Sequence, residues 1–259
     1  MELEIRNATL GYSGKAVLTD VNLTLSTGTT TCFLGKNGAG KTTLFRSLLG
    51  LVPLLGGDVL LDGRSIRRWG RRDYARVVAY VPQARALAFP FPVRDVVLFG
   101  RTAHLSTFAY PRRKDRLIAD DCLERLHISH LSDRLFTRLS GGEQQMVIVA
   151  RALAQQPTFL IMDEPTASLD FGNQVKIIAQ VNALKDESLG ILMATHEPDH
   201  AFMCRANVLV AHNGKLWKSG DCDSVITDAM LKEIYDVNVC VCRMKDVNNR
   251  IIRTCLPVI

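Results

Sequence analysis

The feature that most constrains this chain is a glycine-rich loop near its N-terminus, with the sequence Gly35-Lys36-Asn37-Gly38-Ala39-Gly40-Lys41-Thr42. It fits G-x-x-x-x-G-K-[ST], the phosphate-binding P-loop pattern. Residues 30–34 before it are apolar and strand-like, and residues 43–49 after it have helical apolar spacing. Glycines let the loop turn its backbone N–H groups inward, where the positive end of the helix dipole adds to them. The sequence therefore predicts a strand, loop and helix that bind a nucleoside triphosphate.

The length of the chain allows a sizeable core. At 259 residues and 47% hydrophobic residues, it can form one large domain or two small ones. No apolar run approaches the roughly 18–20 residues that span a bilayer, and the charged N-terminus does not fit a signal peptide. We expect a soluble, cytosolic chain, which at a membrane would depend on the spanning segments of another protein.

Charge and cysteine content bear on three other possibilities, namely nucleic-acid binding, disulfide bonds and metal binding. The net charge of +6 includes an arginine-rich stretch at residues 64–76. No known nucleic-acid-binding motif accompanies it, so a solvated helical face, or one turned to lipid or a partner, is favoured over a nucleic-acid patch. The seven cysteines are odd in number and form no C-x-x-C pair, which favours free thiols. Cys240, Cys242 and Cys255 could hold a metal, but no second ligand pair lies at zinc spacing.

The pattern along the chain changes twice. Residues 1–30 read as short alternating strands, and 56–63 and 77–81 as further strands. Residues 84–156 show helical patterns and no obvious strand. The strand pattern returns at 159–162 and 190–195, and a hairpin is expected at 208–217. We expect one helix at 224–236 and a short strand-bearing tail after it.

Two adjacent carboxylates, Asp163 and Glu164, follow the apolar run at residues 159–162. Four apolar residues predict a buried strand of parallel type, and open α/β sheets bind ligands at the carboxyl ends of their strands. Because neighbouring residues on a strand point in opposite directions, we expect Asp163 to face Mg²⁺ and Glu164 to face an attacking water. Alone, the pair also fits an acidic turn that ends a strand. The P-loop favours the nucleotide interpretation.

A third motif opens a predicted helix and reads Leu139-Ser140-Gly141-Gly142-Glu143-Gln144-Gln145. Ser140 fits an N-cap, and Glu143 three residues later completes a capping box, which alone would be a purely structural interpretation. The same arrangement makes a second glycine-flanked helix N-terminus, which can bind a phosphate.

In this order the motifs resemble those of the ATP-binding subunits of ABC transporters. Residues 139–145 resemble the signature motif, Tyr12 fits the aromatic A-loop, Gln83 the Q-loop, residues 167–170 the D-loop and His196 the H-switch. The resemblance covers about residues 3–225. It implies a P-loop NTPase (RecA-like) α/β core with an N-terminal antiparallel β subdomain and an α-helical subdomain inserted at about residues 84–156. Residues 1–225 would form the ATPase domain and 226–259 a short C-terminal extension.

The resemblance also implies an ATPase that works as a homodimer of head-to-tail copies. Each ATP would lie between one copy's P-loop and the other copy's signature helix. Glu164 would act as the general base, His196 would contact the γ-phosphate, and Thr42, Gln83 and Asp163 would hold Mg²⁺, with Gln83 also linking the site to the transporter interface. The implied nucleotide contacts are Tyr12, Gly35, Lys36, Asn37, Gly38, Ala39, Gly40, Lys41, Thr42, Thr43, Ser140, Gly141, Gly142 and Asp170.

Three stretches resemble the importers of iron-siderophores, haem, cobalamin and molybdate more closely, namely residues 93–111, 163–174 and 231–237. This resemblance implies two permease chains, a periplasmic or surface substrate-binding protein, and a place at the cytoplasmic face of the membrane. A groove including residues 84–100 would receive the permease. A metal chelate is the expected cargo, with molybdate or tungstate as the alternative. A soluble ABC protein is disfavoured by the single motif set, and an exporter by the stretch after Gly100.

Residues 196–200 read H-E-P-D-H and formally match the zinc-protease motif H-E-x-x-H. That motif needs both histidines on one face of a helix. Here it directly follows a predicted strand, and Pro198 cannot occupy a helix interior. We therefore expect no protease site, and we expect His200 in the first turn of the next helix.

Overall fold

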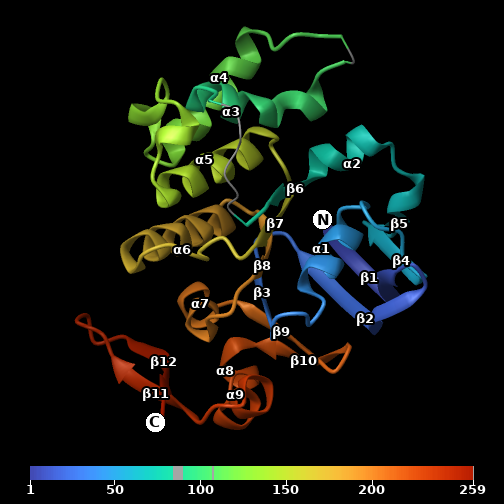
Figure 1. Cartoon of the computed structure of the whole chain (residues 1–259), viewed down its shortest axis with the longest axis vertical. Coiled ribbons are helices and arrows are strands. Elements are labelled where there is room, and N and C mark those ends of the chain that lie inside the picture. Colours follow the sequence, from blue (N-terminus) through green and yellow to red (C-terminus); the bar gives the residue numbers. More distant parts are fainter. Residues whose placement is uncertain (84–89, 107, 259) are drawn as a thin grey trace.

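The computed structural model describes residues 1–83, 90–106 and 108–258. A ten-stranded mixed sheet runs through these residues in the order β5-β4-β1-β2-β10-β9-β3-β8-β7-β6, and the helices gather around it (Figure 1). The strands are β1 Glu2–Tyr12, β2 Lys15–Ser26, β3 Thr30–Leu34, β4 Gly56–Leu61, β5 Arg64–Ser65, β6 Val78–Val81, β7 Phe159–Asp163, β8 Gly190–Ala194, β9 Asn207–His212 and β10 Lys215–Asp221. The helices are α1 Lys41–Leu48, α2 Arg71–Val77, α3 Val93–Leu98, α4 Arg113–Arg125, α5 Gly141–Ala154, α6 Phe171–Asp186, α7 Pro198–Cys204, α8 Cys222–Val225 and α9 Asp228–Tyr235.

Five neighbouring strands, β9, β3, β8, β7 and β6, pair in parallel. Every residue of β3, β7 and β8 is buried, which is why these strands appear in the sequence as continuous apolar runs rather than alternating ones. The predicted strands at 159–162 and 190–195 are confirmed. Their carboxyl ends lie side by side, since β7 pairs along its length with β8 up to Asp163 and Ala194.

The N-terminal part of the sheet is antiparallel, as predicted. β1 pairs with β2 and with β4 in antiparallel register. Their inward side chains pack with α1 and with the near face of the parallel strands in one buried cluster that includes Leu10, Leu18, Phe33 and Phe45. This cluster fixes α1, and therefore the loop before it, against β1 and β2.

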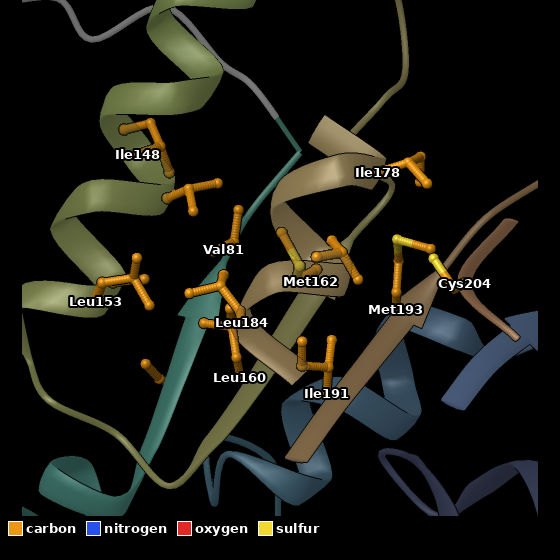
Figure 2. Close-up of a cluster of buried hydrophobic side chains, with 14 of the residues drawn as sticks. Val81, Ile148, Leu153, Leu160, Met162, Ile178, Leu184, Ile191, Met193 and Cys204 are labelled. Carbon is orange, nitrogen blue, oxygen red and sulfur yellow. The ribbon is translucent and has the colours of Figure 1, made fainter. Parts of the chain in front are cut away.

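The other face of the parallel strands packs against helices. Figure 2 shows side chains of α5, α6 and α7 meeting those of β6, β7 and β8. The labelled members are Val81, Ile148, Leu153, Leu160, Met162, Ile178, Leu184, Ile191, Met193 and Cys204. The same cluster continues into α3 and α4, so the helical insertion predicted near residues 84–156 shares its core with the sheet. Residues 84–89 of that predicted insertion lie outside the described residues.

A buried ion pair joins the helices of the insertion. Arg101 follows α3, in a short 3₁₀ helix over Phe99–His104, and is 4% exposed. Its Nε donates to Asp115 Oδ1 of α4 at 3.1 Å, and its Nη1 donates to the carbonyl of Ala154, the last residue of α5, at 2.7 Å. A backbone N–H of Arg112 and the Arg101 guanidinium hold the pKa of Asp115 below its ordinary value.

Asp115→Asn is expected to lower the free energy of unfolding by about 3 kcal/mol, because removing one charge leaves the buried guanidinium unpaired. The carboxyl's pKa is lower in the folded state, so its contribution is present above the unfolded-state pKa and is lost as the pH falls. Urea unfolding at neutral and acidic pH tests both points. Asp120→Asn, on the exposed face of the same helix, is the control, and an equal loss in both variants would contradict the assignment.

The C-terminal region differs from the predicted single helix over 224–236. The chain forms two helices, α8 and α9, and the Thr227 hydroxyl accepts a hydrogen bond from the Met230 N–H at 3.2 Å to begin α9. A two-stranded hairpin follows, made of β11 Val239–Lys245 and β12 Ile251–Pro257. Asp199 of α7 accepts hydrogen bonds from the Thr254 hydroxyl and the Cys255 N–H, both at 2.8 Å. The hairpin is thereby attached to the helix that begins two residues after His196. Within the described residues, each helix is too short or too polar to cross a membrane.

Candidate functional site

The P-loop connects β3 to α1 as the sequence predicts. Gly38 and Gly40 have φ angles of 81° and 96°, in the left-handed region that favours glycine. A Cβ at Gly40 would lie 2.7 Å from Leu18 Cγ of β2, so this glycine is needed both for its conformation and for the close approach. Residues 36–38 form an exposed rim, while Lys41 and Thr43 in the first turn of α1 are buried.

Lys41 is the charged centre of the site and is only 6% exposed. Its Nζ donates to the Gly35 carbonyl at 2.9 Å and lies 3.3 Å from Glu164 Oε1. It also lies 3.0 Å from His196 Nδ1. Burial lowers the pKa of Lys41, and the charge of Glu164 partly offsets this. Two acceptors from distant parts of the chain, Glu164 and His196, therefore surround this buried side chain.

His196 contacts the same carboxylate, with its Nε2 2.5 Å from Glu164 Oε1. Because the Lys41 ammonium can only donate, the facing Nδ1 accepts, and the ring N–H lies on Nε2. The Nε2–H then donates to Glu164. Lys41, Glu164 and His196 form a closed polar cluster in which the carboxylate is held by two donors.

Asp163 contacts the first turn of α1. Its Oδ2 accepts hydrogen bonds from the Thr42 hydroxyl at 3.4 Å and from the Tyr80 hydroxyl of β6 at 3.2 Å. Burial raises the pKa of Asp163, and the hydrogen bond from Tyr80 opposes that shift. A hydroxyl and a carboxylate are the oxygen ligands that suit Mg²⁺. Mg²⁺ is usually bound by one or two protein carboxylates together with phosphates and water, and Asp163 with Thr42 fits such a set.

The backbone, rather than strand alternation, sets the direction of Glu164. β7 ends at Asp163, and Glu164 follows it with a φ of 49°. We predicted the two directions from the alternation of side chains along a strand. That reason is wrong, because Glu164 is not part of the strand. The left-handed turn sends the carboxylate toward Lys41 and His196. Such a conformation is uncommon for residues other than Gly, Asn and Asp, and is often found at functional sites.

The remaining predicted residues lie at the edges of this cluster or away from it. Tyr12 ends β1 and is 38% exposed, and Gln83 is exposed two residues after β6. Ser140 caps α5: its hydroxyl accepts from the Glu143 N–H, and Glu143 in turn accepts from the Ser140 N–H at 2.8 Å. The predicted capping box is confirmed, and Ser140 and Gly141 are exposed.

Asn173 links the signature motif to the D-loop, a connection that sequence reasoning missed. Asp170 caps α6 by accepting from the Asn173 N–H at 2.9 Å and from its side-chain amide at 2.7 Å. A Cβ at Gly142 would lie within 2.6 Å of that same amide. A side chain at position 142 would therefore have to displace that amide from its contact with Asp170. Tyr80 was also missed, although a polar tip on a strand beside the two carboxylates is a usable signal.

The H-E-x-x-H match is structural, as predicted. α7 begins at Pro198, so His196 lies outside the helix and the two histidines share no helical face. His200 is buried in the first turn, where its Nδ1 lies 2.8 Å from the Thr195 hydroxyl and its Nε2 3.2 Å from Glu197. These contacts fix the turn that carries His196.

Comparisons of sequence and of overall structure both lead to one family. The ABC transporter family model matches residues 18–167. An ABC transporter ATP-binding protein of Haemophilus influenzae is 40% identical and covers 91% of this chain and 89% of its own. A Helicobacter pylori protein named for iron chelatin transport is 35% identical and covers 91% and 93%. A solved metal-chelate type ABC transporter, in an inward-facing conformation, superimposes with a TM-score of 0.88 at 27% identity, over 99% of this chain and 97% of that one.

The fold, the P-loop and the ordered motifs agree with the family match. The members of this family are ATPases that serve transporters. The chain belongs to the ABC transporter family, as an ATP-binding subunit that hydrolyses ATP.

Proposed function

We propose that this chain powers a membrane importer of a metal chelate of the ferric siderophore, haem or cobalamin type. The observation that carries the proposal is the similarity to a metal-chelate type transporter over nearly the whole chain, the C-terminal hairpin included. The name of the Helicobacter relative supports the same cargo class. Molybdate or tungstate is the alternative, because the stretch at residues 100–111 resembles those importers too.

The site residues divide the reaction among them. Bound ATP with Mg²⁺ supplies the phosphoryl group and a divalent charge against the phosphates. Lys41, at the start of α1, adds a positive charge next to the loop. Thr42, Gln83 and Asp163 would hold the metal. Glu164 takes the proton of the attacking water as general base. His196 holds that carboxylate through its Nε2–H in the present arrangement, and would contact the γ-phosphate.

We propose that the working form is a homodimer in which Ser140, Gly141 and Gly142 of one copy complete the site of the other. The support lies in how the chain arranges its own motifs. The cluster around Lys41 is built from α1 and from the turns after β7 and β8, whereas Ser140 caps α5 and is exposed. The family resemblance adds Tyr12 and Asp170 as contacts to the bound nucleotide.

A groove of about 1130 Å³ offers a docking place for a permease. Its lining comes from α2, from the segment after α1 and from the helical subdomain, and includes Leu51, Trp69, Phe99, Arg151 and Gln155. Leu51 and Phe99 are 68% and 46% exposed, which suits an apolar helix end of a partner. Residues 84–89, which we also predicted to line such a groove, lie outside the described residues. In this proposal two permease chains hold the ATPase at the cytoplasmic face of the membrane, and the substrate-binding protein acts only through them.

Uptake in the host organism tests the cargo. A strain without this gene is expected to lose accumulation of one radiolabelled chelate among ferric siderophore, haem and cobalamin, and the wild-type gene should restore it while Glu164→Gln should not. Loss of molybdate uptake alone would identify the alternative cargo. Unchanged uptake of every compound would reject the importer proposal.

Ser140→Arg tests the homodimer. A bulky cation at the start of α5 should block closure of two copies, so hydrolysis should fall to background while each copy still binds ATP through its own P-loop. Ser140→Ala removes the same cap hydrogen bond, worth about 1 kcal/mol, without the bulk, and controls for folding. Hydrolysis and ATP binding are measured for each. If Ser140→Arg also loses ATP binding, Ser140 acts within its own chain and the proposal fails.

A further inference from the structure

The C-terminal hairpin carries three sulfur side chains at alternate positions of β11, namely Cys240, Cys242 and Met244. Alternate residues of a strand share one face of it. The two cysteines lie with their sulfur atoms 3.3 Å apart, and both are free thiols. Cys240 and Met244 are exposed, and Cys242 is half-buried. The hairpin therefore presents two adjacent thiols and a thioether on one accessible face.

The third cysteine of the hairpin belongs to the opposite face. Cys255 of β12 pairs with Val241, and both pack against the hydrophobic core. The partners of the sulfur-bearing residues are Leu256, Thr254 and Ile252. This separation gives a natural comparison within one hairpin, since one cysteine faces inward and two face outward.

The thiol pair is held on a firmly anchored strand. β11 and β12 pair in unbroken antiparallel register from Val239 to Lys245. The Val241 N–H, on the outer edge of β11, donates to Asp228 Oδ1 at 2.7 Å, while Asp199 accepts from the outer edge of β12. Both edges are occupied by carboxylates, so the backbone that carries the two thiols is held in place before any ligand arrives.

We propose that Cys240 and Cys242 chelate a thiophilic monovalent cation of the Cu(I) class, with the Met244 thioether as a neighbouring third ligand. Metal–sulfur bonds of about 2.3 Å can both reach one ion across a gap of 3.3 Å. Thiolate and thioether ligands select Cu(I) over hard cations such as Mg²⁺ and Ca²⁺.

The ligand count separates Cu(I) from zinc. Structural zinc sites take four protein ligands and catalytic sites three. Among the described residues no group of three or more His, Cys, Asp or Glu side chains could hold a metal, so a zinc site of that kind is not available at the hairpin. Two thiolates and one thioether are one ligand short of the four that a structural zinc site takes, whereas soft thiolate and thioether ligands suit Cu(I).

Titration of the full-length, fully reduced chain with Cu(I), in competition with a chromophoric Cu(I) chelator under anaerobic conditions, tests the site. We expect one equivalent to be retained. Cys240→Ser and Cys242→Ser should each weaken binding by about 100-fold, because one of two thiolate bonds is lost. Met244→Leu should weaken it by about tenfold, as expected for a supporting ligand.

Cys255→Ser is the matched control, because it removes a cysteine from the inward face of the same hairpin, and it should retain the full equivalent. Equal retention by Cys240→Ser, or loss only in Cys255→Ser, would overturn the assignment. Absence of Cu(I) binding by the reduced chain, together with a Cys240–Cys242 disulfide in the air-exposed protein seen by peptide mass, would identify a redox pair instead and would also overturn it. Retention of Zn²⁺ in preference to Cu(I) would have the same meaning.

Discussion

Glu164→Gln is expected to bind ATP as the wild-type chain does and to hydrolyse it about 10²–10⁴-fold more slowly, because the general base is lost. Glutamine keeps an acceptor oxygen for the His196 Nε2–H, so the local arrangement should survive. Only the charge beside Lys41 and the ability to take a proton disappear. Hydrolysis rates at saturating ATP, together with nucleotide titration, measure the two effects separately.

The control for this variant is Glu197→Gln, which changes a neighbouring carboxylate of the same turn. Glu197 is largely exposed and contacts His200 and Gln174 rather than Lys41. It should hydrolyse ATP at close to the wild-type rate. Near-normal turnover of Glu164→Gln would instead show that another group accepts the proton, whatever the control does.

Lys41→Ala should act one step earlier and weaken ATP binding itself, by about 10- to 100-fold, since a hydrogen bond between charged groups contributes about 1.5–3 kcal/mol. Two effects contribute to the loss of ATP affinity. The lysine no longer contacts the phosphates, and the negative charge of Glu164 in the site is no longer balanced. Lys41→Met keeps the volume of the side chain and should lose affinity to a similar degree. Fluorescent nucleotide titration at fixed ionic strength measures it.

Lys232→Ala, which removes an exposed lysine from α9, controls for net charge and should bind ATP normally. Wild-type affinity in Lys41→Met would mean that the lysine charge is not what holds the phosphates. Weak binding in Lys41→Ala alone would point to packing of the long side chain against the loop.

The sequence predicted best where a local pattern decides the structure. The runs at 159–162 and 190–195 were recognisable because strands buried on both faces are continuously apolar, and the Ser140 cap because its partner is three residues away. The break between α8 and α9 was missed. Ile226 and Thr227 between the two helices have extended backbone angles, and Thr227 caps α9.

The contacts that complete the site were less predictable, because they join residues far apart in the chain. Tyr80 reaches Asp163 across 83 positions, and Asp199 holds Thr254 across 55. The periodicity of apolar residues along a sequence does not predict contacts between residues so far apart. Family resemblance could assign roles to Lys41, Glu164 and His196, but not the three-way cluster that they form. The direction in which the Glu164 side chain points depends on its own φ angle, and no pattern of residues in the sequence predicted that angle.

That dihedral angle has a consequence for anyone who engineers this protein. A left-handed glutamate costs about 1 kcal/mol relative to a residue that adopts the conformation freely, so glycine or asparagine at position 164 would relieve it. Selection for heat tolerance alone would thus tend to replace the residue that turnover depends on. A library screened for thermal robustness should keep position 164 fixed, or pair every round of heating with an activity assay.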